Sequence, residues 1–116
     1  ETDFVARSEE FVKLGKELAM QVAATGPEAV TPKDLPADTI EQERNIYLGQ
    51  FADKPQQIRD KIIEGKLEKF YEEVCLLQQP YIRDEDRKVQ DIVDEAIAIL
   101  GENIKVQRFV RLELGR

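Results

Sequence analysis

The chain has 116 residues, with 17 Lys or Arg and 24 Asp or Glu, so its net charge at pH 7 is −7. It contains no His and one Cys, which excludes histidine metal sites, His-based catalytic triads, intrachain disulfides and thiolate clusters. The acidic balance argues against nucleic acid as the main ligand, because phosphate neutralisation requires clustered Lys and Arg. No apolar stretch approaches the roughly 20 residues of a membrane span. A protein partner is the remaining expectation. Because the chain opens at Glu1 without a Met, we also expect a piece of a longer protein.

Regular apolar spacing predicts a first helix that begins after Ser8 and ends at Thr25. Its apolar residues recur every three or four positions, which marks one helix face: Phe11, Leu14, Leu18, Ala19 and Val22. Ser8 is expected to cap the free amide groups of the first turn. Gly26 permits a left-handed cap and Pro27 cannot continue the helix, so both residues end it.

A proline-rich connection and a second helix are expected next. Residues 29–31 are long enough for a stub of strand, and Thr31 followed by Pro32 favours a single tight turn. The second helix is expected from about Asp38 to Ala52. Four of its residues are expected to face inward: Ile40, Tyr47, Leu48 and Phe51.

Two short helical runs are expected to meet at Gly65. The first begins at Pro55, which suits the first position of a helix. The apolar residues of the two runs are Ile58, Ile62 and Ile63, then Leu67, Phe70, Tyr71 and Val74. Because Gly costs about 1 kcal/mol inside a helix, two short helices fit this pattern better than one straight helix.

The C-terminal third predicts a short extended piece at residues 81–82, a helix and a long strand. The acidic residues 84–86 suit the positive end of a helix dipole, with a cation site as the alternative. The helix stripe is Val89, Ile92, Val93, Ala96 and Leu100, and Gly101 ends the helix. From Ile104 to Leu114 the apolar period changes from 3.6 to 2, which predicts one strand. One strand is not stable alone, so it requires upstream sequence or a second subunit.

No residues have a catalytic spacing. Adjacent carboxylates such as Glu9 and Glu10, or Glu72 and Glu73, point about 100° apart on a helix. Cys75 has apolar neighbours and no basic one, so we expect a buried structural thiol. The tyrosines are expected in a core or interface: Tyr47, Tyr71 and Tyr81. The six Gly are scattered, so no Gly-rich phosphate loop is present.

The aromatic residue nearest the start of the chain has two interpretations. Thr2-Asp3-Phe4-Val5 precedes the cap expected at Ser8. Phe4 either packs on the first turn as a hydrophobic staple or is an exposed anchor for a protein partner.

Several blocks of sequence, in order, resemble the translation elongation factor Ts family. Residues 1–7, Glu-Thr-Asp-Phe-Val-Ala-Arg, resemble its Thr-Asp-Phe-Val-Ala signature. Further similar blocks are residues 18–24, 54–58, 64–70, 76–81 and 101–109. The resemblance implies an α+β fold, with helices packed against a small antiparallel sheet, in one core or dimerisation domain over residues 1–116. The chain resembles the short, single-core form. It lacks the family's N-terminal helical module and the strands before the signature, so we expect an N-terminally truncated core.

The resemblance also implies a guanine-nucleotide exchange factor that promotes GDP release from elongation factor Tu, and not an enzyme. In that family, the segment that corresponds to Thr2, Asp3, Phe4 and Val5 intrudes into the partner's nucleotide-binding domain and disturbs its Mg²⁺ site. The implied partners are elongation factor Tu, GDP-bound or nucleotide-free, and a second copy of the chain. No cofactor, bound metal, nucleic acid or membrane contact is implied. The alternative is a homodimerising interaction domain without exchange activity. The expected location is the bacterial cytoplasm, with a plastid or the mitochondrial matrix as the alternative.

Overall fold

The computed structural model describes residues 2–101, and the side chains of residues 7–101. Within these residues the elements are α1 (Thr2–Thr25), η1 (Pro32–Asp34), α2 (Ala37–Gln50), α3 (Gln56–Val74), η2 (Leu76–Gln78), β1 (Pro80–Tyr81), β2 (Asp84–Lys88) and α4 (Val89–Leu100). Helices α1 to α4 together with the antiparallel β1–β2 sheet confirm the expected α+β class. The strand predicted from Ile104 to Leu114 lies outside the described residues.

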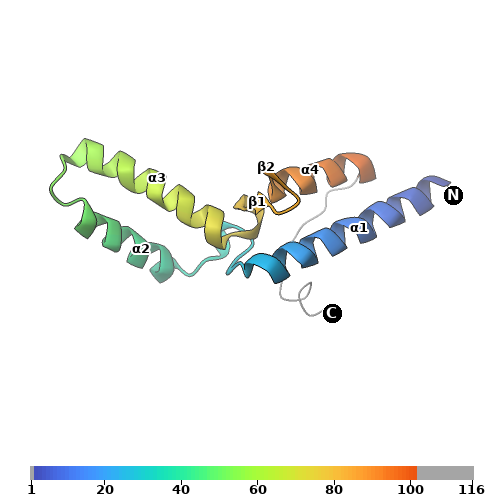
Figure 1. The fold of residues 1–116 in the computed structure, drawn as a ribbon, viewed down its shortest axis with the longest axis horizontal. Coiled ribbons are helices and arrows are strands. Elements are labelled where there is room, and N and C mark those ends of the chain that lie inside the picture. Colours follow the sequence, from blue (N-terminus) through green and yellow to red (C-terminus); the bar gives the residue numbers. More distant parts are fainter. Residues whose placement is uncertain (1, 102–116) are drawn as a thin grey trace.

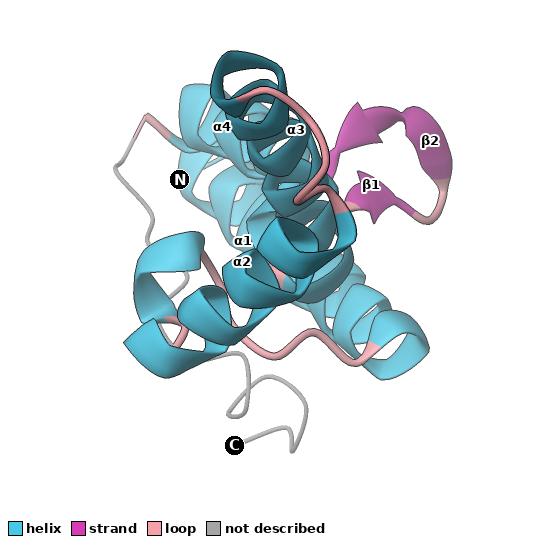
Figure 2. Cartoon of the chain, turned by 90° about the vertical axis from the view of Figure 1, so that its left-hand side faces the viewer, coloured by secondary structure: helices cyan, strands magenta, loops and turns pink. Residues whose placement is uncertain are grey.

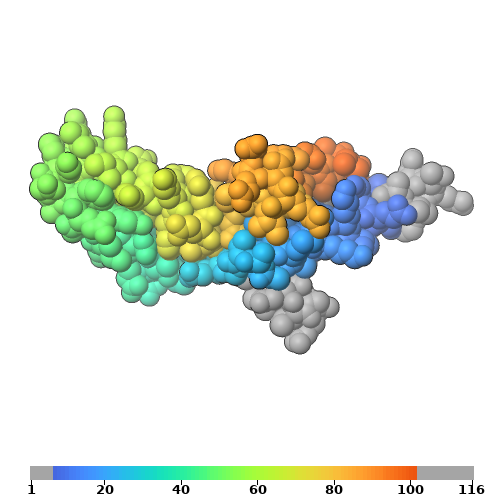
Figure 3. All heavy atoms as spheres, in the orientation of Figure 1, coloured from blue at the N-terminus to red at the C-terminus, as the bar shows by residue number. Residues whose placement is uncertain are grey.

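The helices form two pairs that lie end to end (Figure 1). Helix α1 packs with α4, and α2 packs with α3. The result is elongated, with extents of 63 × 25 × 23 Å and a radius of gyration of 17.4 Å. A compact domain of 100 residues has a radius near 13 Å. Figure 3 shows the same outline, with α2, α3 and the turn between them extending from one end. We call this segment, residues 37–74, the arm.

The larger apolar cluster lies between α1 and α4. Its buried members are Leu14, Leu18, Val22, Leu76, Val89, Val93 and Ala96. This confirms most of the predicted first stripe, but the prediction for Phe11 was wrong, because 58% of its surface is exposed. The reason is length: α4 has 12 residues and α1 has 24. Helix α1 extends past the end of α4 (Figure 1), so α4 covers only part of the stripe.

A second cluster lies at the base of the arm. Its buried members are Ala29, Leu35 and Cys75, against which Ile40, Phe70, Tyr71 and Val74 pack. An isolated parallel bridge joins Ala29 to Cys75, where the expected stub of strand lies. The tight turn after Thr31 is confirmed as η1, in which the Asp34 carboxylate accepts a hydrogen bond of 3.1 Å from the Thr31 amide.

The inward face predicted for α2 was only partly correct. None of its residues is fully buried, and Leu48 is 37% exposed. Ile40, Tyr47 and Phe51 are half-buried. In α3, Ile63 and Leu67 are fully buried, whereas Ile58 is 52% exposed. A single neighbouring helix can cover only one side of α2, so most of the surface of α2 stays in contact with solvent.

The break predicted at Gly65 was wrong, because α3 is one continuous helix from Gln56 to Val74. Gly65 is exposed, and a Cβ at this position would meet nothing within 4 Å. The buried side chains of Ile63 and Leu67 lie on either side of it in sequence. Their burial outweighs the cost of about 1 kcal/mol that Gly adds to a helix.

Two predicted helix starts were also wrong. Helix α1 begins at Thr2, so Ser8 is an exposed interior residue and not a cap. Ser costs only a few tenths of a kcal/mol inside a helix, which a continuing hydrogen-bond ladder offsets. The acidic residues 84–86 lie in β2, which pairs with β1 to one side of the helices (Figure 2). At the start of α4, Asp91 instead accepts a hydrogen bond of 3.0 Å from the Lys88 amide.

The predicted ends of the first and last helices are confirmed, whereas α2 ends at Gln50 and not at Ala52. Helix α1 stops at Thr25, and Gly26 follows with φ +56°. Helix α4 stops at Leu100, and Gly101 follows with φ +69°. Both are left-handed conformations that favour Gly.

Candidate functional site

The sequence-predicted site residues Thr2, Asp3, Phe4 and Val5 lie in the first turns of α1. This end of α1 projects past α4 at one extremity of the molecule (Figure 1). Their side chains are outside those that the structure describes. The staple interpretation of Phe4 depended on a cap at Ser8, and was wrong because Ser8 lies inside the helix. The anchor interpretation stays a prediction.

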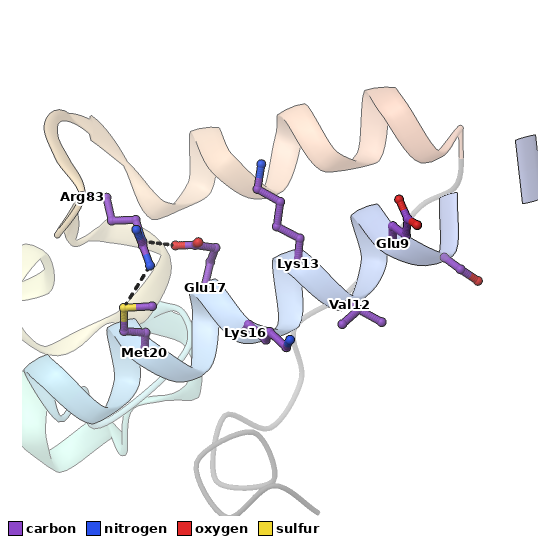
Figure 4. A pocket seen from close by; sticks show the side chains of 8 residues that line it. Glu9, Val12, Lys13, Lys16, Glu17, Met20 and Arg83 are labelled. Atoms are coloured by element: carbon purple, nitrogen blue, oxygen red, sulfur yellow. Dashed lines mark hydrogen bonds and ion pairs between the residues drawn. The ribbon is translucent and has the colours of Figure 1, made fainter. Parts of the chain in front are cut away.

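An open groove of about 490 Å³ runs along α1 from Ser8 to Met20 (Figure 4). Its lining residues are Ser8, Glu9, Val12, Lys13, Lys16, Glu17, Met20 and Arg83. Val12 and Met20 are 53% and 39% exposed, so apolar surface lies between charged side chains. Such a surface suits contact with another protein better than it suits chemistry on a small molecule.

One end of the groove is fixed by interactions between α1 and the β1–β2 turn. Arg83 Nε lies 2.7 Å from a Glu17 carboxylate oxygen, and the Tyr81 hydroxyl donates a hydrogen bond to the same carboxylate. Figure 4 shows Arg83 directed toward both Glu17 and Met20. Burial, followed by the bond to Glu17, raises the pKa of Tyr81 to about 12. These contacts hold the turn against α1.

The residues with intrinsic reactivity are placed as structural groups. Cys75 is fully buried, and burial, with the nearby Asp34 and Glu28 carboxylates, raises the pKa of its thiol to about 11. The prediction of a buried thiol is therefore confirmed. All three tyrosines are half-buried: Tyr47, Tyr71 and Tyr81. Among the described residues, no group of three His, Cys, Asp or Glu side chains is arranged to hold a metal ion. None of the helices in residues 2–101 has both the length and the apolar character needed to cross a membrane.

Sequence reasoning missed one feature, a buried pair of glutamines. Gln21 and Gln79 are 0% and 3% exposed, and the Gln21 side-chain amide donates a 3.1 Å hydrogen bond to Gln79 Oε1. One signal was available: Gln21 lies three residues after Leu18 and directly before Val22, on the buried face of α1. Nothing local marked Gln79, which is 58 residues away in sequence.

Comparison with known proteins gives consistent results along the chain. A family model described as Elongation factor TS matches residues 12–116. Elongation factor Ts of Thermodesulfovibrio yellowstonii is 51% identical over 117 residues, covering 100% of this chain and 59% of that protein. Elongation factor Ts of Thermotoga petrophila is 55% identical over 115 residues, covering 99% of this chain and 58% of that protein.

The matches also define how much of those proteins the chain represents. It spans slightly under 60% of the length of these two curated relatives. Residues 2–5 lie before the range matched by the family model but inside the alignment with the first relative, which covers the whole chain. With most of its residues matched by the family model, the chain belongs to the elongation factor Ts family.

Proposed function

We propose that this chain, residues 1–116, is the core of a guanine-nucleotide exchange factor that promotes GDP release from elongation factor Tu. The observation that supports this most strongly is the family membership, together with the Thr-Asp-Phe-Val-Ala signature at the projecting end of α1. The proposed location is the bacterial cytoplasm, as the relatives that the chain matches are bacterial.

In the proposed mechanism, Thr2, Asp3, Phe4 and Val5 insert into the nucleotide-binding domain of the partner and disturb its Mg²⁺ site. Mg²⁺ demands near-ideal octahedral geometry and bridges phosphate oxygens to protein ligands. A small displacement of its ligands therefore weakens nucleotide binding. The coupling is reciprocal, so bound nucleotide weakens the binding of this chain by the same free energy.

The packing of α1 fits this role. A helix of 24 residues is about 36 Å long. Its C-terminal half is anchored by Leu14, Leu18 and Val22 against Leu76 and α4, whereas its first turns project. Insertion into a partner requires a segment that keeps its orientation on contact. A helix whose other end is packed in the core meets that requirement.

The experiment follows fluorescent GDP leaving elongation factor Tu in the presence of wild-type protein and the Phe4→Ala variant. Burial of a Phe is worth roughly 1.5–3 kcal/mol, so we expect the exchange rate to fall about ten- to hundredfold. Phe11→Ala is the matched control, because Phe11 is exposed and lies seven residues, or two helical turns, further along the same helix. Equal exchange by the wild type and the Phe4→Ala variant would refute the insertion mechanism, as would equal losses for both variants.

The second candidate function is a homodimerising interaction domain without exchange activity. Exposed apolar side chains on both helices of the α1–α4 pair favour it, since Phe11 and Ile99 are each 58% exposed. Under this alternative the wild-type chain sediments at twice its mass of 13.3 kDa and leaves GDP release unchanged. A monomer that accelerates GDP release would exclude it.

A further inference from the structure

A network of hydrogen bonds around two buried glutamines, Gln21 and Gln79, lies where the arm joins the rest of the molecule. Gln21 of α1 has no exposed surface. Its side-chain Nε2 donates to Gln79 Oε1 at 3.1 Å and to the Pro80 carbonyl at 3.0 Å. Its Oε1 accepts a 3.0 Å bond from the Ile82 amide. Both donor hydrogens of this amide are therefore used, and all three partners lie in residues 79–82.

Gln79 extends the network to the end of the arm. Its Nε2 donates a 3.0 Å bond to the carbonyl of Glu73, in the last turn of α3. Its Oε1 also lies 2.9 Å from the Thr25 hydroxyl, at the C-terminal end of α1. Its backbone carbonyl accepts a 3.0 Å bond from the Val89 amide, at the start of α4. One side chain and its backbone thus connect α1, α3 and α4.

The location matters because the arm meets the α1–α4 pair only at its base, as the end-to-end arrangement in Figure 1 shows. Apolar contacts are non-directional and tolerate small rotations between packed surfaces. Hydrogen bonds restrict distance and angle, and an unpaired buried amide is unfavourable. All hydrogen bonds of the network can therefore form together only over a narrow range of angles between α1 and α3.

We propose that Gln21 and Gln79 are positioning residues that fix the angle between the arm and α1. The consequence for binding rests on the proposed function: a fixed angle lets the arm and the first turns of α1 contact one partner protein at the same time. The angle itself is a property of this chain and is measured without the partner.

The test measures distances between two spin labels, one on each side of the joint. The labels are attached to Lys16→Cys on α1 and Asp53→Cys at the tip of the arm, both exposed positions. The native Cys75 is fully buried and does not compete for labelling in the folded protein. A second pair inside the arm, Glu41→Cys with Lys69→Cys, reports whether the arm itself stays intact.

In the Gln79→Met variant, which keeps the side-chain length, we expect a broader distribution for the pair across the joint and no change for the pair inside the arm. Val93→Ala is the control for general loosening, because Val93 is buried between α1 and α4 and makes none of the network's hydrogen bonds. We expect it to lower the melting temperature without broadening either distribution. If Gln79→Met does not fold, Thr25→Val removes a hydroxyl that lies 2.9 Å from Gln79 Oε1 and 2.7 Å from the Gln21 carbonyl oxygen, and it is expected to broaden the same distribution.

The proposal is overturned if the distance distribution across the joint is unchanged in folded Gln79→Met, or in Thr25→Val where Gln79→Met does not fold. It is also overturned if Val93→Ala broadens that distribution equally. The exchange assay is read separately. If the wild-type protein is active, we expect Gln79→Met to lower the rate of GDP release about fivefold or more. Fivefold is the lower end of the usual range of coupling between sites. Inactive wild-type protein refutes the proposed function, while the distances still decide whether the glutamines fix the angle.

Discussion

Replacing Gly65 by Ala is expected to stabilise the protein. Gly65 lies inside α3, and a Cβ built there meets nothing within 4 Å. Its φ is not positive, since the positive-φ Gly of the described residues are Gly26 and Gly101. Ala avoids the backbone entropy that Gly loses in a helix, which amounts to about 1 kcal/mol. For a domain of this size, that free energy raises the melting temperature by about 4 °C.

Gly101→Ala is the matched control, because the same chemical change meets the opposite backbone conformation. Gly101 has φ +69° at the end of α4, and its Cβ also has open space. A left-handed conformation costs an L-residue roughly 1–2 kcal/mol. We therefore expect this variant to melt at a lower temperature than the wild type.

Thermal unfolding followed by circular dichroism, together with urea titration, measures both variants. The opposite signs separate a conformational effect from a general effect of adding a methyl group. If α3 were instead broken at Gly65, with Gly65 in a left-handed cap, Ala would destabilise the protein there as well. A lower melting temperature for Gly65→Ala would thus refute the continuous helix.

Three further outcomes follow from buried or half-buried groups. Leu76→Ala is expected to lower the free energy of unfolding by about 2–5 kcal/mol in urea titration, because Leu76 has no exposed surface; a loss under about 1 kcal/mol would contradict its place in the core. The pKa of Tyr81 rises from 10.0 to about 12 on folding, so the folded state holds this proton more tightly. Stability from this group is complete below pH 10 and is lost as pH rises toward 12, and Tyr81→Phe is expected to lack this loss in alkaline melting curves. Cys75 is expected to react with thiol reagents only when urea unfolds the chain, since its thiol is buried and its pKa is about 11; rapid labelling of the folded protein would refute this.

Local signals predicted the helix ends well. Gly26 and Gly101 adopt left-handed conformations immediately after α1 and α4, as a Gly that follows an apolar stripe indicates. These positions are decided by the backbone of one residue, so neighbouring sequence is sufficient. Gly65 does not adopt a left-handed conformation, because the burial of the residues before and after it in sequence keeps the helix continuous.

Strand β2 shows why another element was missed, although the extended piece predicted at residues 81–82 overlaps β1. Residues 84–88, Asp-Glu-Asp-Arg-Lys, have no apolar alternation, and none of them is fully buried. Their pairing depends on a turn that Gln21 holds through the Ile82 amide and that Glu17 holds through Tyr81 and Arg83. Those contacts join residues about 60 apart in sequence, so no local pattern contains them. For the candidate site, the sequence supplied a family signature, but the helical conformation of residues 2–5 required the structure.

The two apolar clusters are held together by neighbouring residues. Cys75 belongs to the cluster at the base of the arm, and Leu76 to the cluster between α1 and α4. The backbone of Cys75 is extended, with φ −107° and ψ 117°, and successive side chains of an extended chain point to opposite sides. Cys75 therefore points into one cluster and Leu76 into the other. The amides of Leu76 and Leu77 donate hydrogen bonds to the carbonyls of Ala29 and Val30. Together with the glutamine network, this makes the base of the arm the place where a substitution is expected to change the angle between the arm and α1.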